Sequence, residues 1–301
     1  MVLAAADLGS NSFRLQVCAA DGDSLIVLAS LKETVRLAAG LDSQTMLDEA
    51  SQQRALASLS RFAEALREYV PDAVHAVATN TLRVAKNAPA FLERARAVLG
   101  YPIEVISGHE EARLIYSGVA HRMPAAGPRL VVDIGGGSTE LIVGTGMKPT
   151  ETASLQLGCV GYSLKYFGDG ELNEANFSAA EKAARNEMKR ACEALKEHHF
   201  DTAIGSSGTS RALAAMIKAG GGNEIITRKG LADLRQALLQ ARRIDRLKLK
   251  GLRPDRAAVI AGGHAIMTSV FAEFGLEEMF VTRAALREGV LYDLLDRYGG
   301  S

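Results

Sequence analysis

The chain has 301 residues, of which 48% are hydrophobic and 23% are charged, and 35 Lys and Arg balance 35 Asp and Glu. These proportions exclude a disordered chain, and the length favours two domains. Zero net charge argues against general nucleic-acid binding, because a polyanion binder normally needs positive charge.

The sequence lacks the marks of a membrane or secreted protein. No apolar run approaches the roughly 18 to 20 residues of a transmembrane helix, and the short apolar stretch at the N-terminus follows no basic segment. We therefore expect a cytoplasmic protein that binds no membrane. Cys18, Cys159 and Cys192 are far apart and odd in number, which predicts free buried thiols rather than disulfides.

The first half of the chain begins with an apolar run that ends in Asp7-Leu-Gly-Ser-Asn-Ser12. Alternating strands over 13–19 and 24–30 then flank a hairpin signal. A helix is predicted over 44–70 and a short buried strand over 73–79. Further elements follow as a helix over 89–99 and a strand over 103–106. Arg83 comes just after the buried strand, where open α/β sheets bind ligands, so it is placed to meet an anion. The alternative is a solvated surface cation.

The segment Ser107–Leu114 reads Ser-Gly-His-Glu-Glu-Ala-Arg-Leu and enters a helix that is predicted to run to about residue 120. Glu110 and Glu111 fall in its first turn, where acidic side chains are favoured by the helix macrodipole. A purely structural role for these glutamates is therefore an alternative to a chemical one. Residues 122–128 contain two prolines and a glycine and are predicted to link two halves.

The second half opens with Leu130–Glu140, which reads Leu-Val-Val-Asp-Ile-Gly-Gly-Gly-Ser-Thr-Glu. A buried strand delivers Asp133 into a glycine turn, and the N–H groups of Gly135, Gly136 and Gly137 can approach an oxyanion because no Cβ blocks them. The alternative is a tight turn whose glycines supply only backbone freedom. The chain favours the phosphate-binding interpretation because the same pattern occurs at Asp7–Ser12, which predicts a duplicated fold with phosphates held between the copies.

The remaining elements of the second half follow in order. Ser178-Ala-Ala-Glu181 is predicted to be a capping box that starts a helix to about residue 197. A strand over 201–205 precedes Ser207-Gly208-Thr209 at the start of a helix, which is a further candidate anion site; the alternative is that these residues are ordinary helix caps. Helices over 231–241 and 255–274, a strand over 279–282 and a helix over 284–297 complete the chain.

Six motifs stand in a fixed order along nearly the whole chain: Asp7–Arg14, Ala78–Arg83, Ser107–Leu114, Asp133–Glu140, Ser207–Thr209 and Ala285–Leu291. With them the sequence resembles the Ppx/GppA family of exopolyphosphatases and guanosine pentaphosphate phosphohydrolases, within the actin-like phosphotransferase superfamily. The resemblance is to short-form members, which lack the C-terminal domain similar to HD phosphohydrolases.

The resemblance implies an α/β fold of two ribonuclease-H-like, actin-like domains. Each would contain a mixed sheet flanked by helices, and the two would face each other across a central cleft. Residues 1–123 would form the first domain and 124–283 the second, with the C-terminal helix at about 284–301 packing back on the first.

The resemblance also assigns roles to individual residues. Glu111 would be the catalytic base, assisted by Asp133 and Glu140. These two carboxylates, with Asp7 as a third ligand, would hold Mg²⁺, for which Mn²⁺ can substitute. The expected phosphate-binding residues are Gly9, Ser10, Asn11, Ser12, Arg14, Arg83, Gly135, Gly136, Gly137, Ser138, Ser207, Gly208 and Thr209.

The function implied is Mg²⁺-dependent removal of the terminal phosphate from inorganic polyphosphate by a homodimeric enzyme. Guanosine pentaphosphate is the alternative substrate. An actin-like kinase that binds adenosine near Ala261-Gly262-Gly263 is a further alternative, disfavoured because the Glu110–Glu111 pair favours hydrolysis. A sensor without catalysis is disfavoured because all three carboxylates are present.

Overall fold

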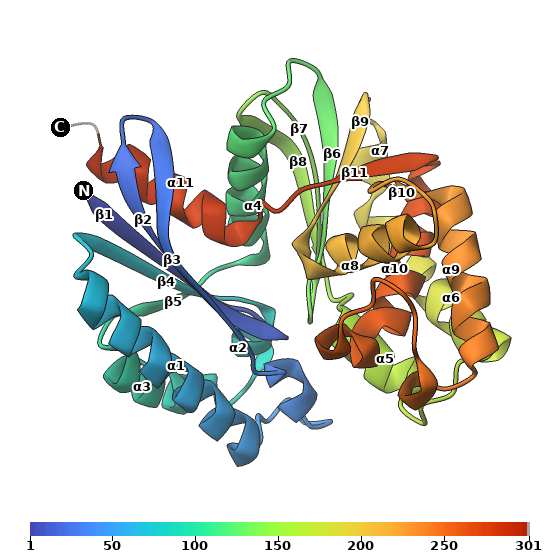
Figure 1. Ribbon diagram of the computed structural model, residues 1–301, viewed down its shortest axis with the longest axis horizontal. Coiled ribbons are helices and arrows are strands. Elements are labelled where there is room, and N and C mark those ends of the chain that lie inside the picture. Colours follow the sequence, from blue (N-terminus) through green and yellow to red (C-terminus); the bar gives the residue numbers. More distant parts are fainter. Residues whose placement is uncertain (300–301) are drawn as a thin grey trace. The chain divides into compact units, whose positions relative to one another are not determined.

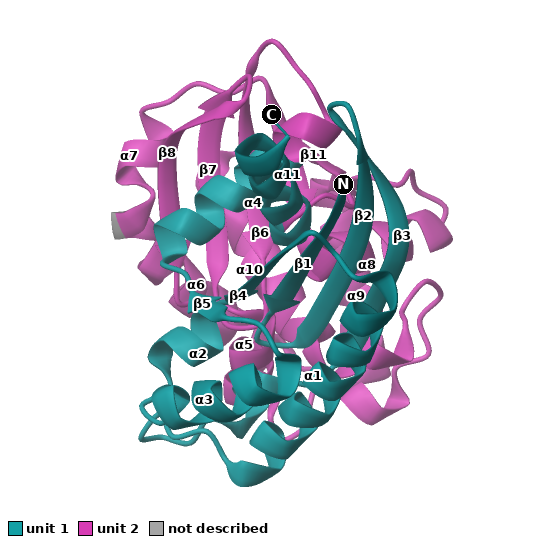
Figure 2. Ribbon diagram, turned by 90° about the vertical axis from the view of Figure 1, so that its left-hand side faces the viewer, with its two compact units in different colours: residues 1–118, 286–301 teal, residues 119–285 magenta. Residues whose placement is uncertain are grey.

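The computed structural model describes residues 1–299 and divides into two compact units. Residues 1–118 and the C-terminal segment from Leu286 form unit 1, and residues 119–285 form unit 2 (Figure 2). The division lies inside helix α4 (Gly108–Arg122) and not in 122–128, where the sequence predicted a linker. Helix α4 continues to Arg122, so the two prolines and the glycine of 122–128 come after the boundary between the two units.

Unit 1 is a five-stranded mixed sheet with helices on both faces (Figure 1). Strands β1, β2 and β3 are antiparallel, and β4 and β5 continue the sheet parallel to β1, in the order β3-β2-β1-β4-β5. The elements besides the start of α4 are β1 (Val2–Leu8), β2 (Ser12–Asp21), β3 (Ser24–Thr34), η1 (Leu37–Gly40), α1 (Glu49–Tyr69), β4 (Ala73–Ala78), α2 (Asn80–Val84), α3 (Ala88–Leu99), β5 (Ile103–Val105) and α11 (Leu286–Tyr298).

The two faces of the unit 1 sheet differ in what covers them. Ala4, Ala6 and Leu8 of β1 belong to the apolar core formed with α1 and α3. Because side chains alternate along a strand, Asp7 lies on the opposite face. Helix α11 packs against β1, β2 and β4 on that face. A Cβ on Gly289 of α11 would lie 1.8 Å from a backbone oxygen of α4, so this glycine permits direct backbone contact.

Unit 2 repeats this arrangement on a six-stranded sheet with the order β10-β11-β9-β6-β7-β8. Its elements after α4 are β6 (Pro128–Ile134), β7 (Thr139–Thr145), β8 (Lys148–Leu155), α5 (Cys159–Phe167), α6 (Glu174–Ala191), α7 (Glu193–Lys196), β9 (Thr202–Ser206), α8 (Ser207–Ala219), β10 (Ile226–Thr227), α9 (Arg228–Ala241), η2 (Ile244–Arg246), η3 (Pro254–Val259), α10 (Ile260–Phe274) and β11 (Glu278–Val281).

The duplication predicted from the sequence is present in the strand order. β6, β7 and β8 form an antiparallel meander like β1, β2 and β3, and β9 and β11 continue parallel to β6 as β4 and β5 do to β1. The two mixed sheets flanked by helices confirm the predicted fold class.

Two local predictions in unit 2 have clear outcomes. The predicted capping box at Ser178–Glu181 is wrong, because α6 begins four residues earlier at Glu174 and the side chain of Asn173 accepts from the N–H of Asn176. Pro254–Phe274 is long and apolar enough to cross a membrane, but 67% of its most apolar window is buried within the protein. It is the core helix of unit 2, packed against α5, α6 and α8.

Candidate active site

The first phosphate-binding turn of the predicted pair lies between β1 and β2. Two of its carbonyl oxygens accept hydrogen bonds from the 36–38 segment. Ser10 O accepts from the N–H of Ala38 and Asn11 O accepts from the N–H of Arg36, both at 2.9 Å. In a trans peptide the C=O and the following N–H point in opposite directions. The N–H of Asn11 is therefore directed away from the 36–38 segment.

Side chains of this turn carry unmet hydrogen-bonding capacity. Asn11 Oδ1 and Ser12 Oγ are buried without a partner in the described part of the chain. Buried polar atoms are normally paired, so orphaned ones mark a place where a ligand completes the bonding. Ser10 Oγ is contacted by the N–H and hydroxyl of Thr81, at 3.3 and 2.8 Å. Thr81 was not assigned a role from the sequence.

Helix α2 connects this turn to the predicted catalytic base. Two residues after Thr81, Arg83 Nη1 donates to Ile106 O at 2.8 Å and to Glu111 Oε2 at 3.2 Å. Glu111 is buried, so the guanidinium supplies both its counter-charge and its orientation. Arg83 Nη2 is buried and has no partner among the residues that the structure describes. The arginine predicted to clamp a phosphate thus also positions the carboxylate.

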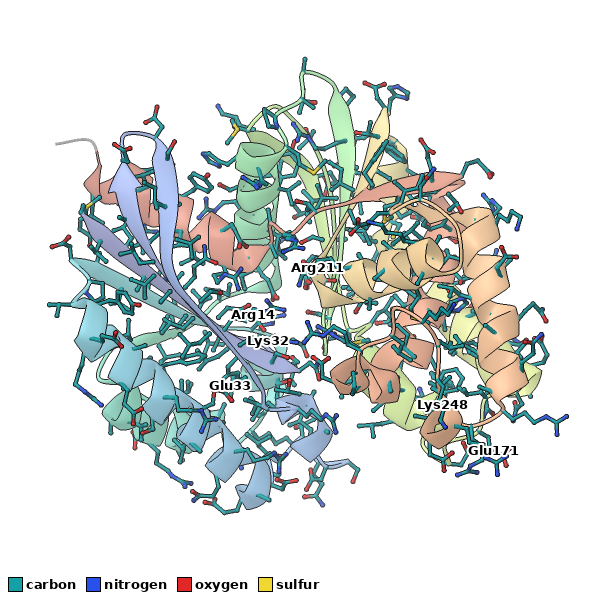
Figure 3. The ribbon with its side chains drawn as sticks, viewed as in Figure 1. Arg14, Lys32, Glu33, Glu171, Arg211 and Lys248 are labelled. Atoms are coloured by element: carbon teal, nitrogen blue, oxygen red, sulfur yellow. The ribbon has the colours of Figure 1, made fainter. Side chains whose placement is uncertain are left out.

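Charged residues also form a row across three strands of unit 1. Asp7 is the register partner of Arg14, and Arg14 is the register partner of Lys32. Arg14 and Lys32 therefore project from the same face of β2 and β3, and both are labelled in Figure 3. The row places two cations beside the single carboxylate of Asp7.

The glycine turn of unit 2 is held by the start of α5. The N–H groups of Cys159 and Val160 donate to Gly135 O and Gly136 O, each at 3.0 Å. By the same peptide geometry, the N–H groups of Gly136 and Gly137 point away from α5, side by side. A Cβ on Gly158 would lie 2.1 Å from Gly136 O, so this approach requires glycine.

The prediction that all three glycine N–H groups are free needs one correction. Gly135 N–H donates to Ser138 O at 2.9 Å, because it closes the turn between β6 and β7. The backbone donors that the turn can offer an anion are therefore those of Gly136 and Gly137. The side chain of Ser138 is buried beside them.

Asp133 and Glu140 face each other directly across the β6–β7 pair. Asp133 is 7% exposed and Glu140 is 1% exposed, so the two carboxylates lie next to each other where little water reaches them. Ser154, the register partner of Glu140 on β8, donates its hydroxyl to Glu140 Oε1 at 2.9 Å. Like charges directly opposite each other on a sheet destabilise it, which a bound cation would reverse.

This donor set fits a magnesium ion. Mg²⁺ is commonly bound by one or two carboxylates together with substrate phosphates and waters, rather than by a closed protein cage. The described residues contain no group of three or more His, Cys, Asp or Glu that could hold a metal. Asp7, the expected third ligand, belongs to unit 1, whereas Asp133 and Glu140 belong to unit 2.

The Ser207–Thr209 segment is used differently from the expectation. Its two hydroxyls donate to Ile134 O, at 3.0 Å from Ser207 and 2.8 Å from Thr209, and so tie the start of α8 to the end of β6. Ser207 has a φ of 73°, a left-handed conformation that is strained for serine. These hydroxyls are structural, and the backbone around Gly208 is what remains for an anion.

Sequence reasoning missed Arg256, which lies over this segment. It is 8% exposed, and its Nη2 would be 1.8 Å from a Cβ on Gly208. No ion pair joins it to a carboxylate among the described residues. Burial raises the pKa of the neighbouring Cys159 thiol, and the Arg256 charge offsets part of that rise. The signal that could have found Arg256 is the dense run of basic residues from 242 to 256.

The place proposed for adenosine in the kinase alternative is filled by packing. A Cβ on Gly262 would lie 2.6 Å from the backbone nitrogen of Ser163 in α5, and one on Gly263 would lie 2.6 Å from Cγ2 of Thr209 in α8. Both glycines are buried and permit the close approach of α10 to these helices. The three cysteines are free and buried, as predicted.

Each unit therefore carries a strand, a turn with backbone donors and nearby buried charge. Unit 1 brings together Ser10, Asn11, Ser12, Arg83 and Glu111 through α2, and unit 2 brings together the 135–138 turn, Asp133 and Glu140. Turns of this kind bind phosphoryl oxygens, and a buried, oriented carboxylate can activate water. An α/β fold with turns and carboxylates of this kind is suited to a phosphohydrolase.

Comparison with known proteins identifies the family. Residues 16–298 match the Ppx/GppA phosphatase family. The chain is 27% identical to the Ppx/GppA enzyme of Aquifex aeolicus, with a TM-score of 0.80, 100% of this chain covered and 99% of that one. The chain belongs to the Ppx/GppA phosphatase family.

Two further crystal structures share the fold. An exopolyphosphatase from Cytophaga hutchinsonii is 24% identical with a TM-score of 0.88, covering 99% of this chain and 98% of that one. An exopolyphosphatase-like protein is 23% identical with a TM-score of 0.90, covering 98% of both chains. The coverage extends over both units in each case.

Proposed function

We propose that this phosphohydrolase removes the terminal phosphate of inorganic polyphosphate and releases orthophosphate. The observation that carries the proposal is the contact chain through α2, in which Thr81 contacts Ser10 of the phosphate-binding turn while Arg83 holds Glu111. One short helix thus fixes an anion-binding turn and a buried carboxylate together, which is the arrangement that hydrolysis of a bound phosphate requires.

In this reaction Glu111 orients the attacking water and accepts its proton at Oε1 or Oε2. A positioned general base contributes about 100- to 10,000-fold to a rate. Arg83 keeps the carboxylate in place and offers Nη2, which has no partner within residues 1–299, to a phosphoryl oxygen. Because the guanidinium is already oriented, it does not need to reorganise as charge develops.

Each of the two turns, considered by itself, offers backbone N–H groups that can bind oxygens of a phosphoryl group. Each pre-aimed donor of this kind is commonly worth about 3 kcal/mol in the transition state. Asp133 and Glu140 would hold Mg²⁺, which when bound neutralises phosphate oxygens and orients the substrate. The row of Arg14 and Lys32 supports the same substrate class, because both cations can neutralise further phosphates.

Guanosine pentaphosphate is the second candidate substrate. It offers the same terminal phosphoanhydride, and the family unites phosphatases of both kinds by name. The two substrates differ in the guanine, which polyphosphate lacks. Measured side by side, they separate the candidates without any assumption about the site.

The test is phosphate release from long polyphosphate, tripolyphosphate, guanosine pentaphosphate and ATP, with and without Mg²⁺. We expect the highest kcat/KM on polyphosphate and a requirement for the metal. A higher value on guanosine pentaphosphate would overturn the polyphosphate assignment and leave a phosphohydrolase. Transfer of phosphate from ATP to an acceptor, without release to water, would instead establish a kinase.

A further inference from the structure

The segment that joins α9 to α10 is strongly basic. Residues 242–256 contain seven Arg or Lys and only two Asp, in a chain whose net charge is zero. Within it, Arg246, Lys248 and Lys250 alternate with Leu247 and Leu249. The leucines are half-buried and the three cations are exposed, so the apolar residues anchor the segment while the charges face solvent. Lys248 is labelled in Figure 3.

Local ion pairs neutralise only part of this charge. Arg243 pairs with Asp245 at 3.3 Å and Arg253 with Asp255 at 3.0 Å, which uses both carboxylates of the segment. No ion pair joins Arg246, Lys248 or Lys250 to a carboxylate in the part of the chain that the structure describes. Three nearby positive charges are therefore without an ion-pair partner among the described residues.

The segment starts from the candidate phosphate site of unit 2 and runs along α8. At one end, Arg256 lies against Gly208 at the start of that helix. Gly251, with a φ of 82°, packs its backbone on Ala215, where a Cβ would lie 2.5 Å from the carbonyl oxygen. At 1.5 Å per residue, Ala215 is roughly 10 Å further along the helix axis than Gly208. The exposed Arg246, Lys248 and Lys250 therefore precede Gly251 in a segment whose other end holds the buried Arg256.

We propose that Arg246, Lys248 and Lys250 form a basic track that binds the distal phosphates of a linear polyphosphate chain. The inference rests on the proposed function, because the terminal phosphate of the same chain would occupy the candidate active site. A linear polyphosphate carries charge along its whole length and can contact the site and the track together. Tripolyphosphate is too short to reach both.

The chemistry of the track matches a flexible polyanion. Exposed ion contacts are individually weak and are screened by salt, so three of them bind a multiply charged chain without fixing its conformation. Binding a polyanion through such contacts releases counterions and makes affinity fall steeply with salt. The track would therefore set chain-length preference rather than the rate of bond cleavage.

The chain offers a matched control in another basic region of unit 2. Lys182, Arg185 and Lys189 of α6 are exposed and line a cavity of about 540 Å³ between α6 and α10. No ion pair joins them to a carboxylate in residues 1–299. Replacing these three removes as much charge as replacing the track, but far along the chain from the segment that contacts α8.

The experiment compares Arg246→Ser/Lys248→Ser/Lys250→Ser with the wild type on long-chain polyphosphate and on tripolyphosphate. We expect the ratio of the two KM values to rise about tenfold in the variant, and the salt dependence of long-chain binding to become shallower. Equal changes on both substrates would overturn the track. So would an equal rise in the ratio for the control in which the three α6 cations are changed to serine.

Binding measurements keep the track testable if the proposed function fails. If the wild type releases no phosphate from either substrate, the hydrolysis proposal is rejected. Equilibrium binding of long-chain polyphosphate to the wild type, the track variant and the α6 control still tests the track. Weaker binding confined to the track variant supports the inference. Indistinguishable affinities for all three proteins reject it.

Discussion

Asp133 faces Glu140 across β6 and β7, whereas Asp7, at the same place in the duplicated hairpin of unit 1, faces Arg14. The two hairpins share their geometry and their strand order but differ in charge. In unit 1 the pair is balanced within the protein. In unit 2 two buried carboxylates are opposed, so that sheet gains from a cation that the other does not need.

The first prediction concerns this opposition. Glu140→Gln removes one of the two facing charges and keeps a side chain of the same size. Like charges directly opposite on a sheet cost about 0.2 to 1 kcal/mol, so without metal the variant is expected to melt a few degrees above the wild type. Added Mg²⁺ should raise the Tm of the wild type and leave that of the variant nearly unchanged, as followed by thermal unfolding.

A surface carboxylate of the same unit serves as the control for this effect. Glu187 lies exposed on α6, and Glu187→Gln should leave both the metal-free Tm and its response to Mg²⁺ as in the wild type. If Glu140→Gln keeps the full Mg²⁺ response, the metal is not held by the Asp133–Glu140 pair.

The second prediction separates the two adjacent glutamates of α4. Glu111 is buried and bonded to Arg83, whereas Glu110 is partly exposed and pairs with Arg113. Glu111→Gln is expected to lower kcat about 100- to 10,000-fold while polyphosphate binding persists, because only the proton acceptor is lost. Glu110→Gln should keep kcat within about threefold, since an exposed ion pair contributes little. Phosphate release and equilibrium binding measure both.

Much of the fold could be read from the sequence because its signals are local. The strand, glycine turn and hairpin recur at Asp7 and Asp133, and the structure repeats the same strand order around them. Hydrophobic periodicity also found α1, although the helix begins at Glu49 rather than at residue 44. Asp48 accepts from Ser51 N–H there, and this cap sets the start that periodicity alone placed too early.

The sequence could not show which partners the polar groups of the site have within the protein. Three glycines in a row look equivalent, but Gly135 N–H is used to close the turn. Ser207 and Thr209 look like phosphate ligands, yet their hydroxyls donate to Ile134 O. Such partners come from β6 and lie more than 70 residues away in sequence, so no local pattern reveals them. The basic run from 242 to 256 marks the segment that holds Arg256, but it does not reveal the contact of Arg256 with Gly208.

The third prediction tests the contact that orients the glycine turn. Gly158→Ala would place a Cβ 2.1 Å from Gly136 O and 2.3 Å from Gly137 Cα, so the turn and α5 must separate. We expect a loss of stability of at least about 2 kcal/mol together with a raised KM, because Gly136 and Gly137 N–H groups lose their alignment. Chemical unfolding and steady-state kinetics report the two effects.

Gly161, one turn further along α5, provides the matched comparison. A Cβ there meets nothing within 4 Å, so Gly161→Ala should stabilise the protein by about 0.5 to 1 kcal/mol through higher helix propensity. Equal behaviour of the two alanine variants would show that the backbone contact at Gly158 is not required.

The fourth prediction concerns His264, which is completely buried in α10. Its Nε2 lies 2.8 Å from Leu231 O and donates to it, while Nδ1 is buried with no partner in the described part of the chain. Burial, against the opposing effect of the Leu231 bond and with a smaller contribution from the nearby Arg235 charge, lowers the pKa of this imidazole to about 4. The folded protein therefore keeps His264 neutral at pH values where the unfolded chain protonates it.

The sign of the pH dependence follows from this difference. Below the ordinary pKa of about 6.5 the unfolded state binds more protons, so stability falls as the pH drops from about 6.5 to about 4. The loss attributable to His264 approaches about 3 kcal/mol at the lower end of that window.

His264→Gln retains an amide donor for Leu231 O but cannot titrate, so its unfolding free energy should fall less over the same range. His199→Gln, at an 80% exposed side chain, should follow the wild type. Parallel curves for wild type and His264→Gln in urea unfolding at pH 7 and pH 4.5 would exclude His264 as a source of acid sensitivity.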